Sequence, residues 1–335
     1  MKYDKILLEH GGGGLLTSEL IAGEFLRHFK NPLLDRLEDS AVFTIGGHTF
    51  CFTTDSYVVS PIFFPGGDIG SLAVHGTVND LAVCGGKPLF LSAGFIIEEG
   101  FEFSDLDRIV RSMSEAARRA GVRIVTGDTK VVPRGSGDGI FINTSGIGTV
   151  DYSGPLSTGS IRPGDAVLIN GTMGDHGAAI LSARESLGFS AQIVSDSAPL
   201  NGLVEEILAA SPNVHCMRDA TRGGVGAVLA EIAKSTRLQI GIVEHDIPVR
   251  EEVRALCEVL GFDPLFLANE GKMVVFCSES DAERVLAAMR GHDLGRDAAR
   301  IGTVGNGPGR VLLKTSIGGE RVVDLPTGEL VPRIC

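Results

Sequence analysis

A cluster of turn residues near the middle of the chain limits the fold most, because it separates two segments that each carry their own strands and helices. The cluster consists of Gly154-Pro155 and Arg162-Pro163-Gly164, and an apolar strand pattern restarts at 166–170. A chain of 335 residues is long enough for each segment to bury its own core. We therefore expect two domains of mixed α+β or α/β type.

The boundary between the two domains is expected near Pro155. The expected parts of the chain are a first domain at 1–155, a second domain at 156–328, and a mobile tail at 329–335 that carries Cys335. The first domain begins with a glycine-rich segment, 1–16, which should be mobile until a ligand binds because glycine costs entropy to order. Further on, Gly46-Gly47 predicts a tight hairpin over 41–53.

The charge balance argues against a polynucleotide partner. There are 30 Lys and Arg residues against 42 Asp and Glu residues, a net charge of −12, which repels a phosphate backbone. A single nucleotide can still bind if a divalent metal lies between carboxylates and phosphates. The longest apolar run, 88–97, is about half the ~20 residues that a membrane helix needs, and the start of the chain has no signal-peptide pattern. We expect neither nucleic acid nor membrane as partner, and a cytoplasmic location with six free cysteines.

Carboxylates stand at the ends of expected strands or beside Gly and Thr. The residues in this setting are Asp39, Asp55, Asp80, Asp128 and Asp219. Dispersed carboxylates that converge from several strand ends suit Mg²⁺ bound together with phosphate oxygens. A turn or N-cap role explains any one of them equally well, except Asp80, because an Asn79-Asp80 pair inside an apolar helix caps nothing. The common phosphate-binding loops, GxxxxGK[ST] and GxGxxG, are absent from the sequence.

Four further residues are candidates for phosphate contact or catalysis: Lys130, Arg222, Glu270 and Cys335. Lys130 lies two residues after Asp128, so both are expected on one face of an extended segment. Arg222-Gly223 stands at an expected helix N-terminus, where anions bind. A solvated surface position explains Lys130 or Arg222 equally well. Glu270 interrupts an apolar run, which suits a general base or a simple turn. Cys335 ends the chain, so it is either a thiol that carries a group between sites or a chance tail residue.

Motifs spread over the whole chain are similar to those of one family. They are HGGGG at 10–14, EDSAV at 38–42, TTD at 53–55, VNDLA at 78–82, TGDTKVV at 126–132, GTMGDHG at 171–177, DATRGG at 219–224, ANEGK at 268–272 and PRIC at 332–335. The chain resembles the hydrogenase-maturation carbamoyl dehydratases, the HypE family, in the superfamily of aminoimidazole ribonucleotide synthetase and selenophosphate synthetase. The Asp positions alone indicate the superfamily, whereas the PRIC ending separates this family from the synthetases.

This resemblance implies a two-domain fold of the aminoimidazole ribonucleotide synthetase type, with ATP in the cleft between the domains. The first domain is expected to form a homodimer through a shared β-barrel. By similarity, the metal ligands for Mg²⁺ are Asp39, Asp80 and Asp219, and the nucleotide contacts are Asp55, Gly127 and Asp128 (the last two reaching the ATP of the partner subunit) and the glycines Gly11, Gly12, Gly13 and Gly14 over the phosphates. Position 38 is Glu where the family pattern has Asp, so no metal role is given to Glu38.

The implied reaction dehydrates a carbamoyl group on Cys335. A HypF-like carbamoyltransferase loads the sulfur, the tail swings into the cleft, and the carboxamide oxygen attacks the γ-phosphoryl of ATP. A thiocyanate remains, with Glu270 as proton acceptor and Lys130 stabilising charge or relaying a proton, and the cyano group passes to iron held by HypC and HypD. Two other functions stay open: an ATP-dependent synthetase or kinase for a free small molecule, and a non-catalytic thiol carrier.

Overall fold

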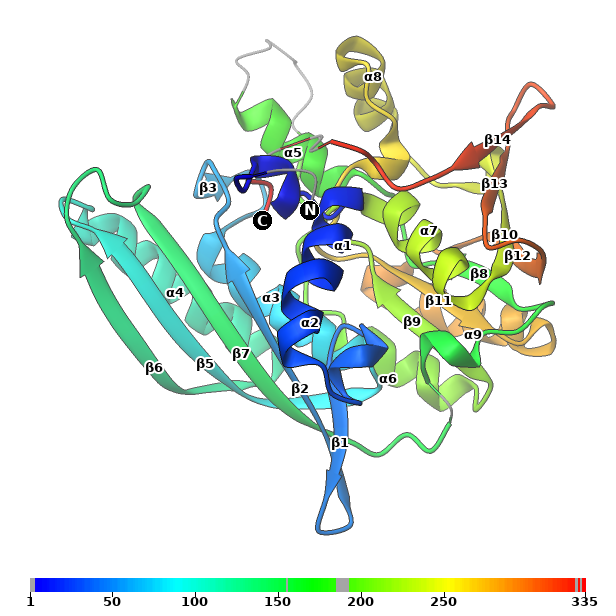
Figure 1. Cartoon of the computed structure of the whole chain (residues 1–335), viewed down its shortest axis with the longest axis horizontal. Helices are drawn as coiled ribbons and strands as arrows, with labels where there is room; N and C mark the ends of the chain where they lie inside the picture. The colour runs from blue at the N-terminus through cyan, green and yellow to red at the C-terminus, as the bar shows by residue number, and fades with distance from the viewer. Residues whose placement is uncertain (1–3, 155, 185–192, 329–330, 332) are drawn as a thin grey trace.

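Two β-sheets, each packed against helices, make up most of the computed structural model (Figure 1). The structure describes residues 4–154, 156–184, 193–328, 331 and 333–335. Pro155 lies outside the described residues, and the exact domain boundary stays a prediction. Within the described residues, no helix combines the length and the apolar character needed to cross a membrane.

The first sheet has five strands. In spatial order they are β1 (Ala41–Ile45), β2 (His48–Tyr57), β7 (Ile140–Val150), β5 (Gly86–Glu98) and β6 (Arg123–Val132). β1 and β2 form the predicted hairpin, and Gly46 and Gly47 both have the positive φ that its two-residue turn requires, which confirms that prediction. β6 is an edge strand that pairs only with β5 among the described residues.

Helices α3 (Ile69–Val83) and α4 (Phe103–Ala120) cover one face of the first sheet. α3 begins at Asp68, whose carboxylate accepts hydrogen bonds from the backbone N–H groups of Gly70 and Ser71. Almost every α3 residue is buried, because the helix also contacts the second domain, and this explains why its sequence is apolar all round. A helix of this kind brings any polar residue that it carries into the protein interior.

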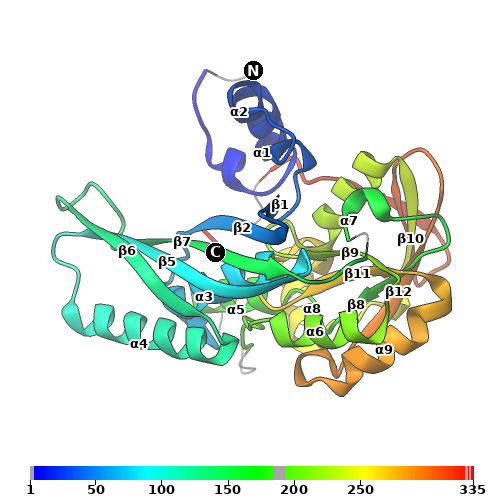
Figure 2. The ribbon, with the colours of Figure 1, turned by 90° about the horizontal axis from the view of Figure 1, so that it is seen from below.

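The N-terminal segment lies on the opposite side of the first sheet from α3 and α4 (Figure 2). After a 3₁₀ turn at Leu8–Gly11 it forms α1 (Leu15–Leu20), a π-helical stretch at Ile21–Phe25 and α2 (Leu26–Phe29). A second 3₁₀ turn at Leu34–Arg36 leads to β1, and a small ribbon of β3 (Phe63–Phe64) and β4 (Gly67–Asp68) precedes α3. The predicted mobility of the glycine-rich segment stays a prediction.

The second sheet has seven strands. In spatial order they are β14 (Glu320–Val323), β13 (Val311–Lys314), β10 (Leu238–Val243), β12 (Ala299–Asn306), β8 (Ala166–Ile169), β11 (Met273–Cys277) and β9 (Val214–Asp219). Side chains of α7 (Gly224–Thr236) pack on one face, and those of α6 (Asn201–Ala210) and α9 (Ala282–Gly291) pack on the other. The central strands β8 and β11 are therefore continuously apolar. α5 (Asp175–Arg184) and α8 (Glu251–Leu260) pack together beside the sheet. This mixed α/β architecture confirms the predicted fold class.

Candidate functional site

Asp80 lies in a buried site between the two sheets, where α3 carries it. Thr53 of β2 donates a hydrogen bond to Asp80 Oδ2 over 2.8 Å. Burial raises the pKa of Asp80 well above its ordinary value, and the carboxylates of Asp219, Asp55 and Asp39 raise it further. Four of the predicted carboxylates therefore come together, three from the first domain and Asp219 from the end of β9 in the second.

These clustered carboxylates need a neutralising partner. Burial raises the pKa of Asp39 although Arg218 lies against it, with Nε 2.8 Å from Oδ2, and burial together with Asp39 raises the pKa of Asp219. Buried carboxylates are costly unless they are protonated or paired with a cation, and carboxylate oxygens are ligands that Mg²⁺ prefers. The chemical type of these donors therefore suits Mg²⁺. In the part of the chain that the structure describes, no three His, Cys, Asp or Glu side chains are arranged to hold a metal ion, so the metal role of Asp39, Asp80 and Asp219 stays a prediction.

The predicted phosphate contacts lie side by side at the edge of this cluster. Arg222, in the turn between β9 and α7, donates a hydrogen bond from Nη1 to the carbonyl of Gly11 over 2.9 Å. Gly13 has φ +73°, and a Cβ there would come within 3.0 Å of the Arg222 Cβ, so glycine is required for this close approach. Gly12, Arg222 and Gly223 line one small cavity together with Ile334 of the tail. The glycine-rich segment therefore lies against both the Arg222 turn and the C-terminal tail.

Glu270 lies in the loop before β11 and is 2% exposed. Its Oε1 is buried without a hydrogen-bond partner among the described residues. Burial raises the pKa of Glu270 well above its ordinary value, and the nearby Asp55, Asp219 and Asp196 raise it further. A buried carboxyl with a raised pKa and an unpaired oxygen has the properties of a general base or acid.

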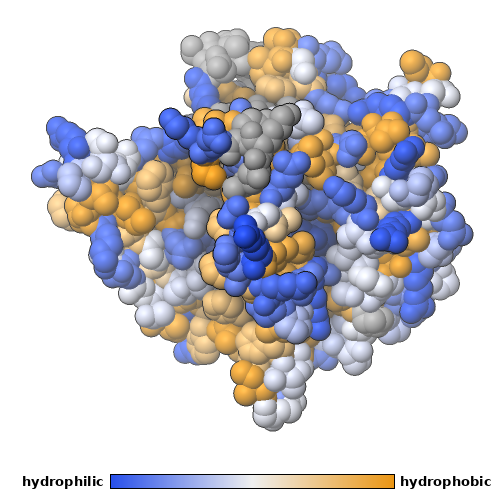
Figure 3. Space-filling view, viewed as in Figure 1, coloured by the Kyte–Doolittle hydropathy of each residue, from blue (hydrophilic) through white to orange (hydrophobic). Residues whose placement is uncertain are grey.

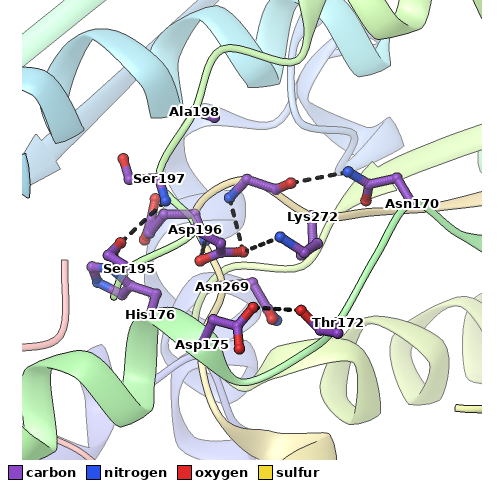
Figure 4. A network of polar contacts seen from close by, with 12 residues as sticks. Asn170, Thr172, Asp175, His176, Ser195, Asp196, Ser197, Ala198, Asn269 and Lys272 are labelled. Atoms are coloured by element: carbon purple, nitrogen blue, oxygen red, sulfur yellow. Dashed lines mark hydrogen bonds and ion pairs between the residues drawn. The ribbon is translucent and has the colours of Figure 1, made fainter. Parts of the chain in front are cut away.

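The position of the Glu270 loop is set by a buried ion pair (Figure 4). Asp196 accepts hydrogen bonds from the backbone N–H groups of Glu270, at 3.1 Å, and of Gly271, at 3.3 Å, and from Lys272 Nζ at 3.0 Å. Although burial opposes ionisation, Lys272 holds the pKa of Asp196 below its ordinary value. Neither Asp196 nor Lys272 was predicted, because no sequence pattern connects a polar loop to a residue 76 positions away.

The C-terminal cysteine is docked inside the same site. Cys335 is 8% exposed, and its carbonyl accepts a hydrogen bond from the backbone N–H of Val58 over 3.0 Å. Burial raises the pKa of its thiol far above the usual range; Arg222 lowers it only in part, and Glu270 and Asp55 add to the increase. The described residues of the tail contact both domains, and its predicted mobility and swing stay predictions.

Lys130, Gly127 and Asp128 are not part of this cluster within one chain. All three lie on the edge strand β6, three strands from β2, or roughly 14 Å at the usual strand spacing. The Lys130 ammonium pairs with the Asp128 carboxylate at 2.6 Å, and both side chains are exposed. Their predicted contact with the site of a partner subunit stays a prediction.

Two polar side chains connect the domains around the site. The Glu38 carboxylate accepts hydrogen bonds from the N–H and the hydroxyl of Thr158, at 2.9 and 3.0 Å, so it has a structural partner in place of a metal. Asn79 accepts a hydrogen bond from the Leu200 N–H over 2.7 Å and donates to the carbonyls of Ala198 and Glu270. Asn79, like Asp80, stands out in the sequence as a polar residue within an apolar helix.

Comparison with known proteins places the chain in a family. Residues 37–150 and 162–314 match the N-terminal and C-terminal domain models of AIR synthase related proteins. Carbamoyl dehydratase HypE of Azotobacter vinelandii is 53% identical over 336 residues, which cover 100% of this chain and 98% of that relative. A crystal structure of a HypE-HypF complex superposes with a TM-score of 0.87 at 51% identity, covering 92% of this chain and 99% of the other. HypE in complex with ATP gives a TM-score of 0.83 at 49% identity, covering 99% and 100%. The chain therefore belongs to the carbamoyl dehydratase HypE family of AIR synthase related proteins.

Proposed function

We propose that this protein dehydrates an S-carbamoyl group on Cys335 to a thiocyanate at the expense of ATP, and so supplies the cyanide ligand for the iron of NiFe hydrogenase. The observation that carries this function is the terminal cysteine itself, which is buried at the carboxylate site, where Glu270 and Arg222 both act on the pKa of its thiol. The name of the relatives and the ATP complex of one of them support it. We place the reaction in the cytoplasm, as the sequence predicts.

The reaction balances without a redox partner. The carbamoyl oxygen forms a bond to the γ-phosphorus of ATP while the bond to ADP breaks, and the C–O bond then breaks as inorganic phosphate leaves. Both N–H protons are lost, so that S–CO–NH₂ and ATP become S–CN, ADP, phosphate and a proton. Glu270 accepts a proton from the nitrogen, and Arg222 offsets the negative charge beside the sulfur. Mg²⁺ on Asp39, Asp80 and Asp219 would neutralise the phosphates.

The protonation state of the Cys335 thiol indicates that the carbamoyl group is loaded in one position of the tail and dehydrated in another. A thiol accepts an acyl group as its thiolate, and burial beside carboxylates keeps the docked thiol protonated. We therefore propose that a HypF-like carbamoyltransferase loads the sulfur while the tail is released. The carbamoylated sulfur is neutral, so the buried site accepts it without this penalty. The crystal structure of a similar HypE-HypF complex supports such a partner. The finished cyano group would pass to iron held by HypC and HypD.

The decisive measurement is mass spectrometry of the C-terminal peptide after incubation with the transferase, its substrates and MgATP. We expect the carbamoyl adduct on Cys335 to lose one water only when ATP is present. An adduct that stays carbamoylated in the presence of ATP would contradict a dehydratase and favour a thiol carrier.

Asp80→Asn should weaken MgATP binding by roughly tenfold or more, because it removes one buried negative charge from the metal site and keeps an oxygen for Thr53. Calorimetric titration with MgATP measures the effect. Asp105→Asn, a half-buried residue in the first turn of α4, is the matched control. Unchanged MgATP affinity and product formation in Asp80→Asn would remove Asp80 from the metal site.

We further propose the predicted homodimer, with a barrel shared between the first domains. The exposed edge strand β6 invites pairing with another chain, and apolar residues gather on this side of the sheet (Figure 3). In such a dimer Lys130 and Asp128 reach the site of the partner subunit. Within one chain their position on β6 is too far from the carboxylate cluster for this contact.

Val131→Asp on β6 should shift the protein from dimer to monomer, because it introduces charge into the proposed interface. Val131 is 67% exposed, and Val259 on α8, 68% exposed, provides a matched control as Val259→Asp. Solution scattering at several concentrations gives the mass. A wild-type monomer would contradict the dimer directly.

A further inference from the structure

The C-terminal tail is held from both domains through its backbone. On one side, the Val58 and Ser60 N–H groups donate to the carbonyls of Cys335 and Arg333, at 3.0 and 3.1 Å. These alternate contacts are those of an added strand, so the intervening carbonyl of Ile334 points to the other side. There it accepts a hydrogen bond of 2.7 Å from His176 Nε2, on α5 of the second domain.

His176 is built to donate this hydrogen bond. It is fully buried, and the ring of Phe64 packs edge-on against it at 5.4 Å. Its Nδ1 lies 2.8 Å from the Ser195 hydroxyl, whose oxygen already accepts from the Ser197 N–H. The Ser195 proton is therefore available for Nδ1, and Nε2 carries the ring proton that a carbonyl partner requires. Burial also lowers the pKa of His176, which keeps the ring neutral.

One loop connects His176 to the Glu270 loop (Figure 4). Ser195 orients the imidazole, and its neighbour Asp196 accepts the backbone N–H of Glu270. At the other end of α5, Arg184 donates to the carbonyls of Arg333 and Ser60. The tail and the Glu270 loop are therefore fixed to a common support, although they are distant in sequence.

We propose that His176 is a positioning residue, which holds the Ile334 carbonyl and thereby sets the sulfur of Cys335 against Glu270 for dehydration. This role rests on the proposed function, since only a reaction on Cys335 makes the position of its sulfur matter. His176 touches backbone and not the sulfur, so the same clamp receives the tail whether the thiol is free or loaded.

Two amide variants distinguish the loss of the hydrogen-bond donor at Nε2 from a change in side-chain size. His176→Gln places an amide NH₂ near the place of Nε2 and keeps the donor to Ile334, whereas His176→Asn reaches only the place of Nδ1 and loses it. The first readout is alkylation of the unloaded, full-length protein, followed on the C-terminal peptide. A hydrogen bond of this kind shifts an equilibrium by about five- to tenfold. We expect Cys335 in His176→Asn to react about five- to tenfold faster than in wild type, and His176→Gln to restore the slow rate.

Cys216 and Cys277, both buried in the second domain, report unfolding in the same experiment, because a variant that merely fails to fold exposes them as well. If Cys335 in His176→Asn reacts at the wild-type rate while Cys216 stays protected, His176 does not hold the tail and the proposal is wrong.

The second readout is single-turnover dehydration of the loaded protein. His176→Asn should lower the maximal single-turnover rate constant by about five- to tenfold, with the ATP concentration for half-maximal rate unchanged, and His176→Gln should recover the rate. Equal dehydration rates in all variants would overturn the positioning role. If the wild type itself does not dehydrate while the alkylation contrast holds, the proposed function fails and the tail clamp stands.

Discussion

Cys335→Ser should abolish thiocyanate formation completely, the largest effect expected for any single change in this chain. The hydroxyl fits the same space, but it is not ionised at neutral pH and cannot take up the carbamoyl group that the thiolate accepts. MgATP binding should persist, because the clustered carboxylates and Arg222 remain in place. Mass spectrometry of the C-terminal peptide and partner-dependent release of phosphate measure the reaction, and calorimetric titration measures MgATP binding.

Cys84→Ser is the matched control for this variant, since Cys84 lies near Asp39 and Asp80 and its thiol donates to the Ser40 carbonyl. It should dehydrate at the wild-type rate. If Cys335→Ser instead retains full partner-dependent ATP turnover, the substrate is a free small molecule and the protein acts as a synthetase or kinase.

Glu270→Gln should slow dehydration by about 10²- to 10⁴-fold, the range expected for loss of a general base. The amide has the same shape, and the contacts of the Glu270 backbone with Asp196 and Asn79 stay intact. Single-turnover conversion of carbamoylated Cys335 measures the rate. Glu283→Gln, an exposed residue in the first turn of α9, controls for loss of a surface charge. A wild-type rate in Glu270→Gln would remove Glu270 as the base.

The pH dependence of the reaction tests the same assignment. Because burial raises the pKa of Glu270 above its ordinary value of 4.5, the carboxyl is still protonated at pH values where an exposed glutamate has ionised. A protonated carboxyl cannot accept a proton, so the wild-type rate should rise with pH through a limb centred above 4.5. In Glu270→Gln this limb should be absent from the residual rate.

The elements with strong local patterns could be predicted from the sequence, and two strands of the second sheet could not. The hairpin at Gly46-Gly47 and the apolar helix α3 follow from turn chemistry and burial. β9 was not predicted, because its polar residues are paired with partners far away in the chain: His215 with Asp165, and Arg218 with Asp39. β12 was not predicted either, since glycines at 302 and 305 interrupt its apolar pattern.

Some residues of the candidate site could likewise be predicted from the sequence, and others could not. Carboxylates such as Asp80 could be found because a charge within an apolar helix conflicts with its surroundings. His176 stood out only as part of a glycine-rich motif, and its partner, the carbonyl of Ile334, has no sequence signal at all. Contacts between loops and backbone carbonyls depend on how the two domains meet, and no local pattern encodes that arrangement.

The burial of Cys335 also affects how readily its thiol is oxidised between reactions. A cysteine at the end of a chain is ordinarily open to oxidants, and sulfenic acid formation would end its use as an acceptor. Oxidation requires thiolate and access, and the docked tail offers neither, because the thiol is protonated and almost fully covered. In the proposed cycle, the resting protein therefore stores its acceptor in reduced form and exposes it only while a partner loads it.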